Sequence, residues 1–212
     1  MSEMKTNHTE VSKKRVNVYS MGIVAVLSAI AYVLMFMEFS VPIMPGFIKM
    51  DLSDLPALIG TFAVGPAGGV FIALIKNVLH LTVTSSAGVG ELSNFILNVV
   101  FILPAGILYK YKKTKASACG GAVLGAVLMA VVSVASNYFI VYPVYYNFMP
   151  EETILAAYQA IFPGVDSILQ SLILFNMPFT FVKAMISVVI TFLIYKRLVP
   201  VLNMFRQRTA KS

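Results

Sequence analysis

The sequence predicts an all-α integral membrane protein, a bundle of six transmembrane helices with the N and C termini in the cytoplasm. Of its 212 residues, 58% are hydrophobic and only 12% are charged, whereas soluble domains are usually about 25% charged. Apolar runs long enough to cross a bilayer recur along the chain. The net charge of +7 comes from short basic blocks beside these runs, which is typical of topology signals and not of nucleic-acid binding.

Four membrane spans are clear, because a helix needs about 20 apolar residues to cross the hydrocarbon core. They cover approximately residues 18–39, 91–109, 117–142 and 173–195. The apolar stretch 52–83 is ambiguous, since "VGPAGG" at 64–69 combines proline with glycines, and both residue types break helices. This stretch is either one span or two short spans joined by a turn at 64–69.

The basic residues decide between five and six spans. They cluster around Lys13, in "KYKKTK" at 110–115 and from Lys196 onward. The positive-inside rule places these clusters in the cytoplasm, and only six spans put all three there. The predicted organisation is a cytoplasmic tail at 1–17, a six-helix membrane domain at 18–197 and a basic cytoplasmic tail at 198–212.

Two connections on the outer side have informative compositions. Residues 40–51, "SVPIMPGFIKMD", have two prolines and apolar side chains where a solvated loop would be polar. We expect this segment either to fold back over the bundle as a cap or to dip into the lipid headgroups. In 148–172, Glu151 and Glu152 open a run with apolar residues at helical spacing, which predicts a short helix at the outer interface.

Three expected helices have polar residues about one turn apart, hence on one face. They are Glu91, Asn94 and Asn98 on the fourth helix, Ser133 and Asn137 on the fifth, and Asn176, Thr180 and Lys183 on the sixth. Such groups avoid lipid and face a bundle interior or a cavity, although amides also hold membrane helices together. Three stripes together favour a polar pocket that opens outward.

Lys183 is the sharpest single signal of a binding site. It falls near mid-membrane, where a lysine costs about 3 kcal/mol on insertion scales, so we expect a partner such as Glu91 or a ligand carbonyl. Amides, a lysine donor and aromatic residues such as Tyr142 and Phe179 suit a flat heterocycle with carbonyl and imide edges.

Small residues mark a packing face on the first helix. Ala25 and Ala29 are four residues apart, a spacing that lets helices approach closely. This face is expected either to pack inside the bundle or to dock on another subunit.

Several kinds of chemistry are not indicated. The chain has neither a P-loop nor the H-E-x-x-H and G-x-S-x-G motifs, and it has a single cysteine, Cys119. The sequence therefore predicts neither an enzyme nor a metal site.

Two runs, "MDLSDLPALIGTFAVGPAGGVFIALIKNVLH" and "GELSNFI", resemble the riboflavin-specific substrate-binding S components of energy-coupling factor (ECF) vitamin transporters. Ala25-x-x-x-Ala29 and "MPFTFVKA" in the sixth helix fit the same family. The resemblance extends from about residue 18 to residue 197.

The resemblance implies a six-helix protein of the bacterial plasma membrane that captures riboflavin from outside, beneath the loop joining helices one and two. It implies docking, through Ala25 and Ala29, on a membrane coupling subunit joined to two ABC-type ATPases, whose ATP hydrolysis drives toppling and release inside. The chain itself would do no covalent chemistry and need no cofactor, since riboflavin is the transported ligand.

The resemblance also implies site residues by position. The cap would place Phe47 and Lys49 over the ligand, Asn137 would meet the flavin ring, and Lys183 matches the family's lysine. Where the family often has asparagine this chain has Thr180, which cannot make the paired amide contact; nearby Asn176 is a candidate to compensate. The expected substrate-binding set is Met44, Phe47, Lys49, Glu91, Asn94, Asn137, Asn176, Thr180 and Lys183.

Two alternatives stay open at this point. An S component for another vitamin, such as thiamine or a pyridoxine, is favoured only by Thr180. A stand-alone membrane transporter, channel or enzyme is a different class, and the missing catalytic motifs count against an enzyme.

The stretch "IKNVLHLT" places Lys76, Asn77 and His80 in an apolar segment. Lys76 is expected to extend its ammonium group toward the outer interface. We expect these residues mainly to form a polar clasp that ties helices two, three and four together below the cap. Direct contact with the substrate is the less favoured hypothesis.

Overall fold

The computed structural model describes residues 18–84 and 86–209, with side chains described as far as residue 194. The predicted N-terminal tail at 1–17 lies outside the described residues. The segment predicted as a basic C-terminal tail continues the last long helix as far as Thr209.

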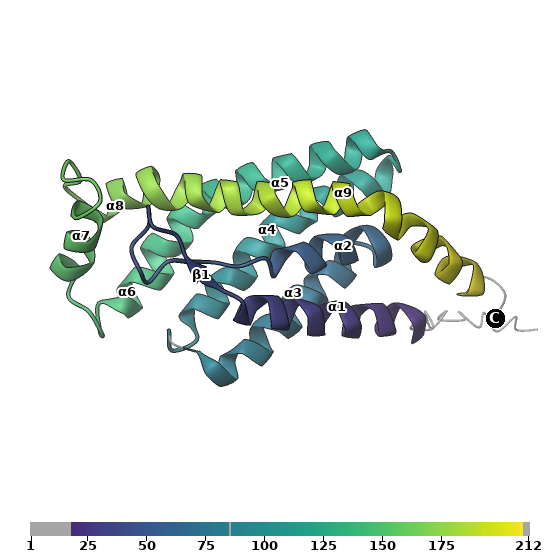
Figure 1. Cartoon of the computed structure of the whole chain (residues 1–212), viewed down its shortest axis with the longest axis horizontal. Coiled ribbons are helices and arrows are strands. Elements are labelled where there is room, and N and C mark those ends of the chain that lie inside the picture. Colours follow the sequence, from purple (N-terminus) through teal and green to yellow (C-terminus); the bar gives the residue numbers. More distant parts are fainter. Residues whose placement is uncertain (1–17, 85, 210–212) are drawn as a thin grey trace, which may run out of the picture.

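The described chain is almost entirely helical. Six helices form the body of the molecule and run along its long axis (Figure 1). They are α1 (Val18–Phe36), α2 (Asp54–Val64), α3 (Pro66–His80), α4 (Val89–Tyr111), α5 (Lys115–Ser136) and α9 (Met177–Thr209). Five stretches of the described chain are long and apolar enough to cross a membrane, namely Val18–Phe36, Pro66–Val83, Val89–Tyr111, Lys115–Tyr145 and Ile168–Ile194. The remaining helix, α2, is apolar but has only 11 residues, or about 16 Å at 1.5 Å per residue.

The ambiguous stretch 52–83 is broken where the glycine-proline pair predicts it. Helix α2 ends at Val64 and α3 begins at Pro66. Gly65 between them has φ +103°, in the region that favours glycine. Pro66 occupies the first turn of α3, where its missing N–H costs nothing. The two helices therefore meet in a one-residue turn, and α3 continues into the short 3₁₀ helix η1 (Leu81–Val83).

Small residues bring α4 and α5 into close contact. A Cβ atom added at Gly125 would lie 2.0 Å from the carbonyl oxygen of Phe101, so the two backbones touch there. The central core around this contact contains Phe101, Ile72, Leu58 and Val188.

Residues 39–50 fold back as a hairpin. Strand β1 (Phe39–Ser40) pairs antiparallel with β2 (Lys49–Met50), with Phe39 opposite Met50. Phe47 and Ile48 from its tip line a cavity in the bundle. The segment thus adopts the cap arrangement and not that of a loop spread outward into headgroups.

The connection after α5 is also ordered. It contains the π-helical segment η2 (Asn137–Val141), the short helix α6 (Tyr142–Tyr145), the predicted outer helix α7 (Glu151–Gln159), α8 (Ile168–Ser171) and a second π-helical segment, η3 (Leu172–Asn176). Figure 1 shows α7 at the end of the molecule opposite the C-terminus. A second apolar cluster, which includes Tyr142, Ile154, Tyr158 and Leu172, joins these elements, with Phe47 of the hairpin packed against it.

Candidate functional site

Two connected chambers lie beneath the hairpin. The first has a volume of about 180 Å³ and the second about 200 Å³. Phe47, Gly90, Asn94, Tyr145 and Lys183 line both, so the chambers form one site. We call them the inner chamber, which reaches Met129 and Thr180, and the outer chamber, which reaches Glu38 and Lys49.

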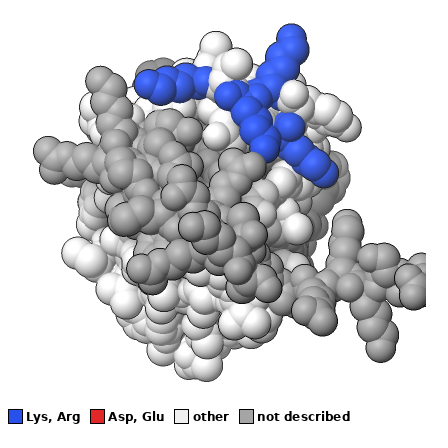
Figure 2. Space-filling view, turned by 90° about the vertical axis from the view of Figure 1, so that its right-hand side faces the viewer, with Lys and Arg blue, Asp and Glu red and all other residues white. Residues whose placement is uncertain are grey.

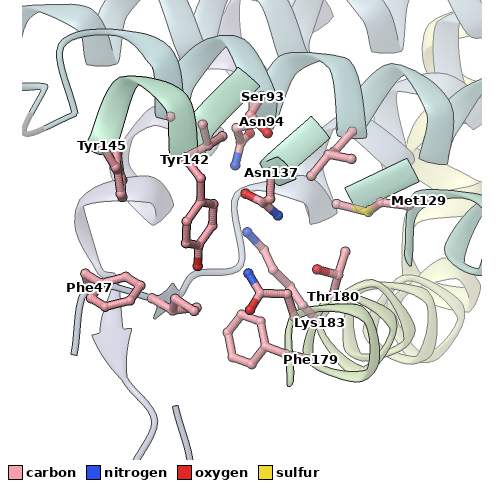
Figure 3. Close-up of a pocket in the computed structure, with 15 residues that line it drawn as sticks. Phe47, Ser93, Asn94, Met129, Asn137, Tyr142, Tyr145, Phe179, Thr180 and Lys183 are labelled. Atoms are coloured by element: carbon pink, nitrogen blue, oxygen red, sulfur yellow. The ribbon is translucent and has the colours of Figure 1, made fainter. Parts of the chain in front are cut away.

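The inner chamber combines amides, a lysine and aromatic rings. Figure 3 shows Asn94, Asn137 and Lys183 pointing toward one another, with the rings of Phe47, Tyr142 and Phe179 around the same space. Hydrogen-bond donors and acceptors thus face flat apolar surfaces. This arrangement suits a planar ligand with polar edges.

Both π-helical segments border this chamber. Asn137 begins η2, and Asn176 ends η3; both asparagines line the inner chamber. Each π turn inserts an extra residue and so shifts the side chains beyond it around the helix axis. Such segments are frequent at functional sites, and here both lie where an amide side chain lines the cavity.

The structure brings most of the predicted site residues together. Phe47, Asn94, Asn137, Asn176, Thr180 and Lys183 line the inner chamber, and Lys49 and Glu91 line the outer one. Met44 lies elsewhere, buried in a separate apolar pocket with Met50 and Phe175. It faces the other way because the Val41–Met44 turn directs it toward the outer part of α9 and away from the cavity.

Of the two partners expected for Lys183, Glu91 is wrong, whereas contact with a ligand carbonyl stays a prediction. The Nζ of Lys183 lies 2.7 Å from Oδ2 of Asp51 and 3.7 Å from Oδ2 of Asp54, whereas Glu91 pairs with His80. Asp51 directly follows strand β2, so the returning hairpin carries this carboxylate into the bundle. Burial tends to raise the pKa of Asp51, but the charges of Lys183 and Lys76 outweigh it and hold that pKa below its ordinary value.

Lys76 does not reach the outer interface, contrary to expectation. Its side chain is fully buried, and its Nζ donates to Ser53 Oγ at 2.6 Å and to Asp54 Oδ1 at 2.9 Å. Asp54 opens α2 beside α3, so it offers Lys76 a charge partner inside the bundle. An ammonium group paired in this way is far less costly than one left alone in an apolar interior.

The polar clasp between helices two, three and four is confirmed. Lys76 joins α3 to α2 through Asp54, and Asn98 joins α4 to the same carboxylate at 3.0 Å. His80 Nδ1 joins α3 to α4 at 2.8 Å from Glu91 Oε1. Asn77 is not part of these links, because its Nδ2 donates to Ala73 O within its own helix.

Sequence reasoning did not pair Lys183 with Asp51 and Asp54, although both aspartates stand in an apolar run, which marks them as needing partners. Ser93, which also lines the inner chamber, was not predicted, because serine is common in membrane helices and gave no signal. Tyr145, which lines both chambers, is one of several aromatic residues in this region and was not in the expected binding set.

The chain matches known proteins over most of its length. The family model for the substrate-specific component of ECF transporters matches residues 20–195. A riboflavin transporter RibU of Staphylococcus aureus is 32% identical over 175 residues, which cover 82% of this chain and 87% of that protein. A riboflavin transporter FmnP of Bacillus subtilis is 33% identical over 193 residues, covering 89% and 95%.

The fold agrees with these matches. The solved structure of the S component of a bacterial ECF transporter superposes with a TM-score of 0.68 at 30% identity, covering 86% of this chain and 96% of that one. The fold, the sequence matches and the family model thus each cover more than four fifths of the chain or residues 20–195 of it, and they agree. The chain belongs to the substrate-specific (S) components of ECF transporters.

Proposed function

We propose that this protein binds riboflavin from outside the cell and is the S component of an ATP-driven ECF importer. The observation that supports this most directly is the site itself, where Asn94, Asn137 and Lys183 converge between aromatic rings beneath the hairpin. A flavin offers a flat ring with carbonyl and imide edges to such groups. Two relatives that match most of the chain are named riboflavin transporters.

The proposed role is transport and not catalysis. The family model that matches residues 20–195 describes the substrate-specific component of a transporter. The charged groups at the site are paired with one another, as Lys183 is with Asp51.

The proposed topology has six crossings, with α2 and α3 as separate crossings joined at Gly65, and both termini in the cytoplasm. Figure 2 views the end of the molecule near the C-terminus and shows a cluster of basic side chains there. The exposed lysines at that end are Lys110, Lys112, Lys113 and Lys115. The positive-inside rule supports a cytoplasmic location for it, so the hairpin faces outward from a bacterial plasma membrane.

The proposed partners are the membrane coupling subunit and the two ABC-type ATPases of an ECF transporter. On α1, Ala25 and Ala29 are exposed, whereas Ser28 and Ala31 are buried. The small residues therefore lie on the face of α1 that the bundle leaves open. A helix of the coupling subunit could approach closely there.

Ligand binding tests the riboflavin assignment. The full chain, purified in detergent, should quench the fluorescence of added riboflavin saturably at micromolar concentration or below. Absence of quenching at micromolar riboflavin would overturn the assignment. Because Thr180 lines the inner chamber where the resemblance implies an asparagine, thiamine and pyridoxine should be tested as competitors, and displacement by either would favour that vitamin instead.

A further inference from the structure

Tyr158 lies outside the chambers but contacts two residues that line the inner one. It belongs to α7, and its side chain is fully buried. Its hydroxyl lies 2.6 Å from the hydroxyl of Tyr142 and 2.7 Å from Oδ1 of Asn176. Both of these partners line the inner chamber.

The direction of these two hydrogen bonds follows from counting protons. A tyrosine hydroxyl has one proton, and the amide oxygen Oδ1 of Asn176 is only an acceptor. Tyr158 therefore donates to Asn176, so Tyr142 must donate its own proton to the oxygen of Tyr158. Burial raises the pKa of Tyr158 above its ordinary value, so this hydroxyl keeps the proton that the arrangement needs.

The ring of Tyr158 is held from two further sides. It packs edge-on against Phe47 of the hairpin, with ring centroids 6.1 Å apart, and at a tilt of 42° against Phe175, with centroids 5.4 Å apart. Because the ring is fixed in this way, the position of its hydroxyl is fixed as well. The orientation of Tyr142 and Asn176 therefore depends on a residue that does not itself line the chambers.

We propose that Tyr158 is a positioning residue that sets the hydrogen-bonding polarity of the inner chamber. With its proton engaged by Tyr158, Tyr142 offers a ligand its oxygen as an acceptor. With Oδ1 engaged, Asn176 offers its NH₂ group as a donor. An acceptor beside a donor complements the N–H and C=O of a lactam or imide edge. This inference rests on the proposed function and deepens it, since the flavin ring has such an edge.

The test compares riboflavin with 3-methylriboflavin, in which the imide N–H is replaced by N–CH₃. The full-length protein in detergent should prefer riboflavin, because the methyl group meets the acceptor oxygen of Tyr142. Tyr158→Phe keeps the ring contacts but removes the hydroxyl. We expect it to weaken riboflavin binding about five- to tenfold, as for one or two lost hydrogen bonds, and to lower the preference for riboflavin over its methyl analogue.

The change in preference separates positioning from a merely structural role, since general loosening of the site would weaken both ligands by the same factor. Tyr138→Phe is the matched control, because Tyr138 is 41% exposed and packs against Phe139. This variant should bind both ligands with unchanged affinity. The double variant Tyr158→Phe/Asn176→Ala should lose less affinity than the product of the two single losses.

Three results would overturn the inference. The first is that the wild-type protein binds riboflavin and its methyl analogue with equal affinity. The second is that Tyr158→Phe keeps the wild-type preference for riboflavin. The third is that the loss of affinity in the double variant equals the product of the two single losses. The comparison of the two ligands on the wild-type protein needs no variant, so the inference stays testable if Tyr158→Phe fails to fold. If the wild-type protein binds no riboflavin at all, the proposed function fails instead, and the two failures are thus distinguishable.

Discussion

At the scale of single residues, the site is organised by charges that compensate one another inside the bundle. Lys76 and Lys183 face Asp51 and Asp54, so two positive and two negative groups are buried together. An ammonium group has three N–H donors. The Nζ of Lys183 lies 2.7 Å from Asp51 and 3.7 Å from Asp54, and the side chain also lines both chambers. The same residue is therefore both a structural ion pair and a candidate ligand contact.

The two lysines should respond differently to removal of their charge. Lys76→Met leaves Asp54 without its nearest cation, at a cost of about 3–5 kcal/mol for a broken buried pair, so thermal stability should fall clearly. Lys76 does not line either chamber, so the folded fraction should still bind riboflavin. Lys183→Met should instead abolish or strongly weaken binding, because the chamber loses its charged donor.

Thermal unfolding and riboflavin titration of both variants check this prediction. Glu152→Gln is a suitable control, since Glu152 is exposed on α7 and its charge should affect neither quantity. Normal stability in Lys76→Met would show that the clasp is dispensable. Normal binding in Lys183→Met would remove this lysine from the site.

At the scale of elements, hydropathy and helix-breaking residues predicted most of the fold, because both signals depend only on residues that are neighbours in the sequence. The long spans follow from runs of apolar residues, and the break at Gly65 follows from the glycine-proline pair. The π turns at Asn137 and Asn176 had no such signal, because they add a residue without any change in composition. The pairing of Lys183 with Asp51 joins positions 132 residues apart, and only the folded hairpin brings them together.

The close contact between α4 and α5 predicts how two glycine substitutions on α5 change the stability of the protein. Gly125→Ala should destabilise the protein, because the new Cβ would lie 2.0 Å from the Phe101 carbonyl oxygen and a backbone atom cannot move aside cheaply. Gly120→Ala on the same helix has nothing within 4 Å of the added Cβ. It should be neutral or slightly stabilising, since alanine is the better helix former. Thermal unfolding of the two variants in detergent measures the difference, and equal melting temperatures would contradict the close contact.

The exposed face of α1 gives a second prediction at this scale. Ala25→Leu or Ala29→Leu should leave riboflavin binding unchanged, because neither residue lines a chamber, but should reduce ATP-dependent uptake by the assembled transporter. The larger side chains would hold the coupling subunit away from the helix backbone. Ala135→Leu is the control, because it adds the same bulk at an exposed alanine of a different helix, α5. Unaltered uptake in both α1 variants would argue against this face as the docking surface.

At the scale of the whole molecule, the ends differ in chemistry. The hairpin covers the site at one end, where α7 also lies, whereas the exposed lysines from Lys110 to Lys115 gather at the other (Figure 2). This polarity agrees with the charge clusters in the sequence. The crossing number depends on α2, whose 11 residues are too few to span about 30 Å of hydrocarbon unless the bilayer thins around them. In the proposed topology α2 and α3 are two crossings joined at Gly65, and the side on which the lysine cluster lies decides the orientation of the bundle.

The chain's single cysteine offers a direct test of this topology. Cys119 is exposed near the start of α5, beside the lysine cluster. With six crossings it is cytoplasmic, so a membrane-impermeant thiol reagent should leave it unlabelled in intact cells and label it in inverted vesicles. A Thr153→Cys substitution in a Cys119→Ser background moves the thiol to an exposed position of α7 and should reverse the pattern. Labelling of Cys119 in intact cells would place the basic end outside and would overturn the proposed orientation of the bundle.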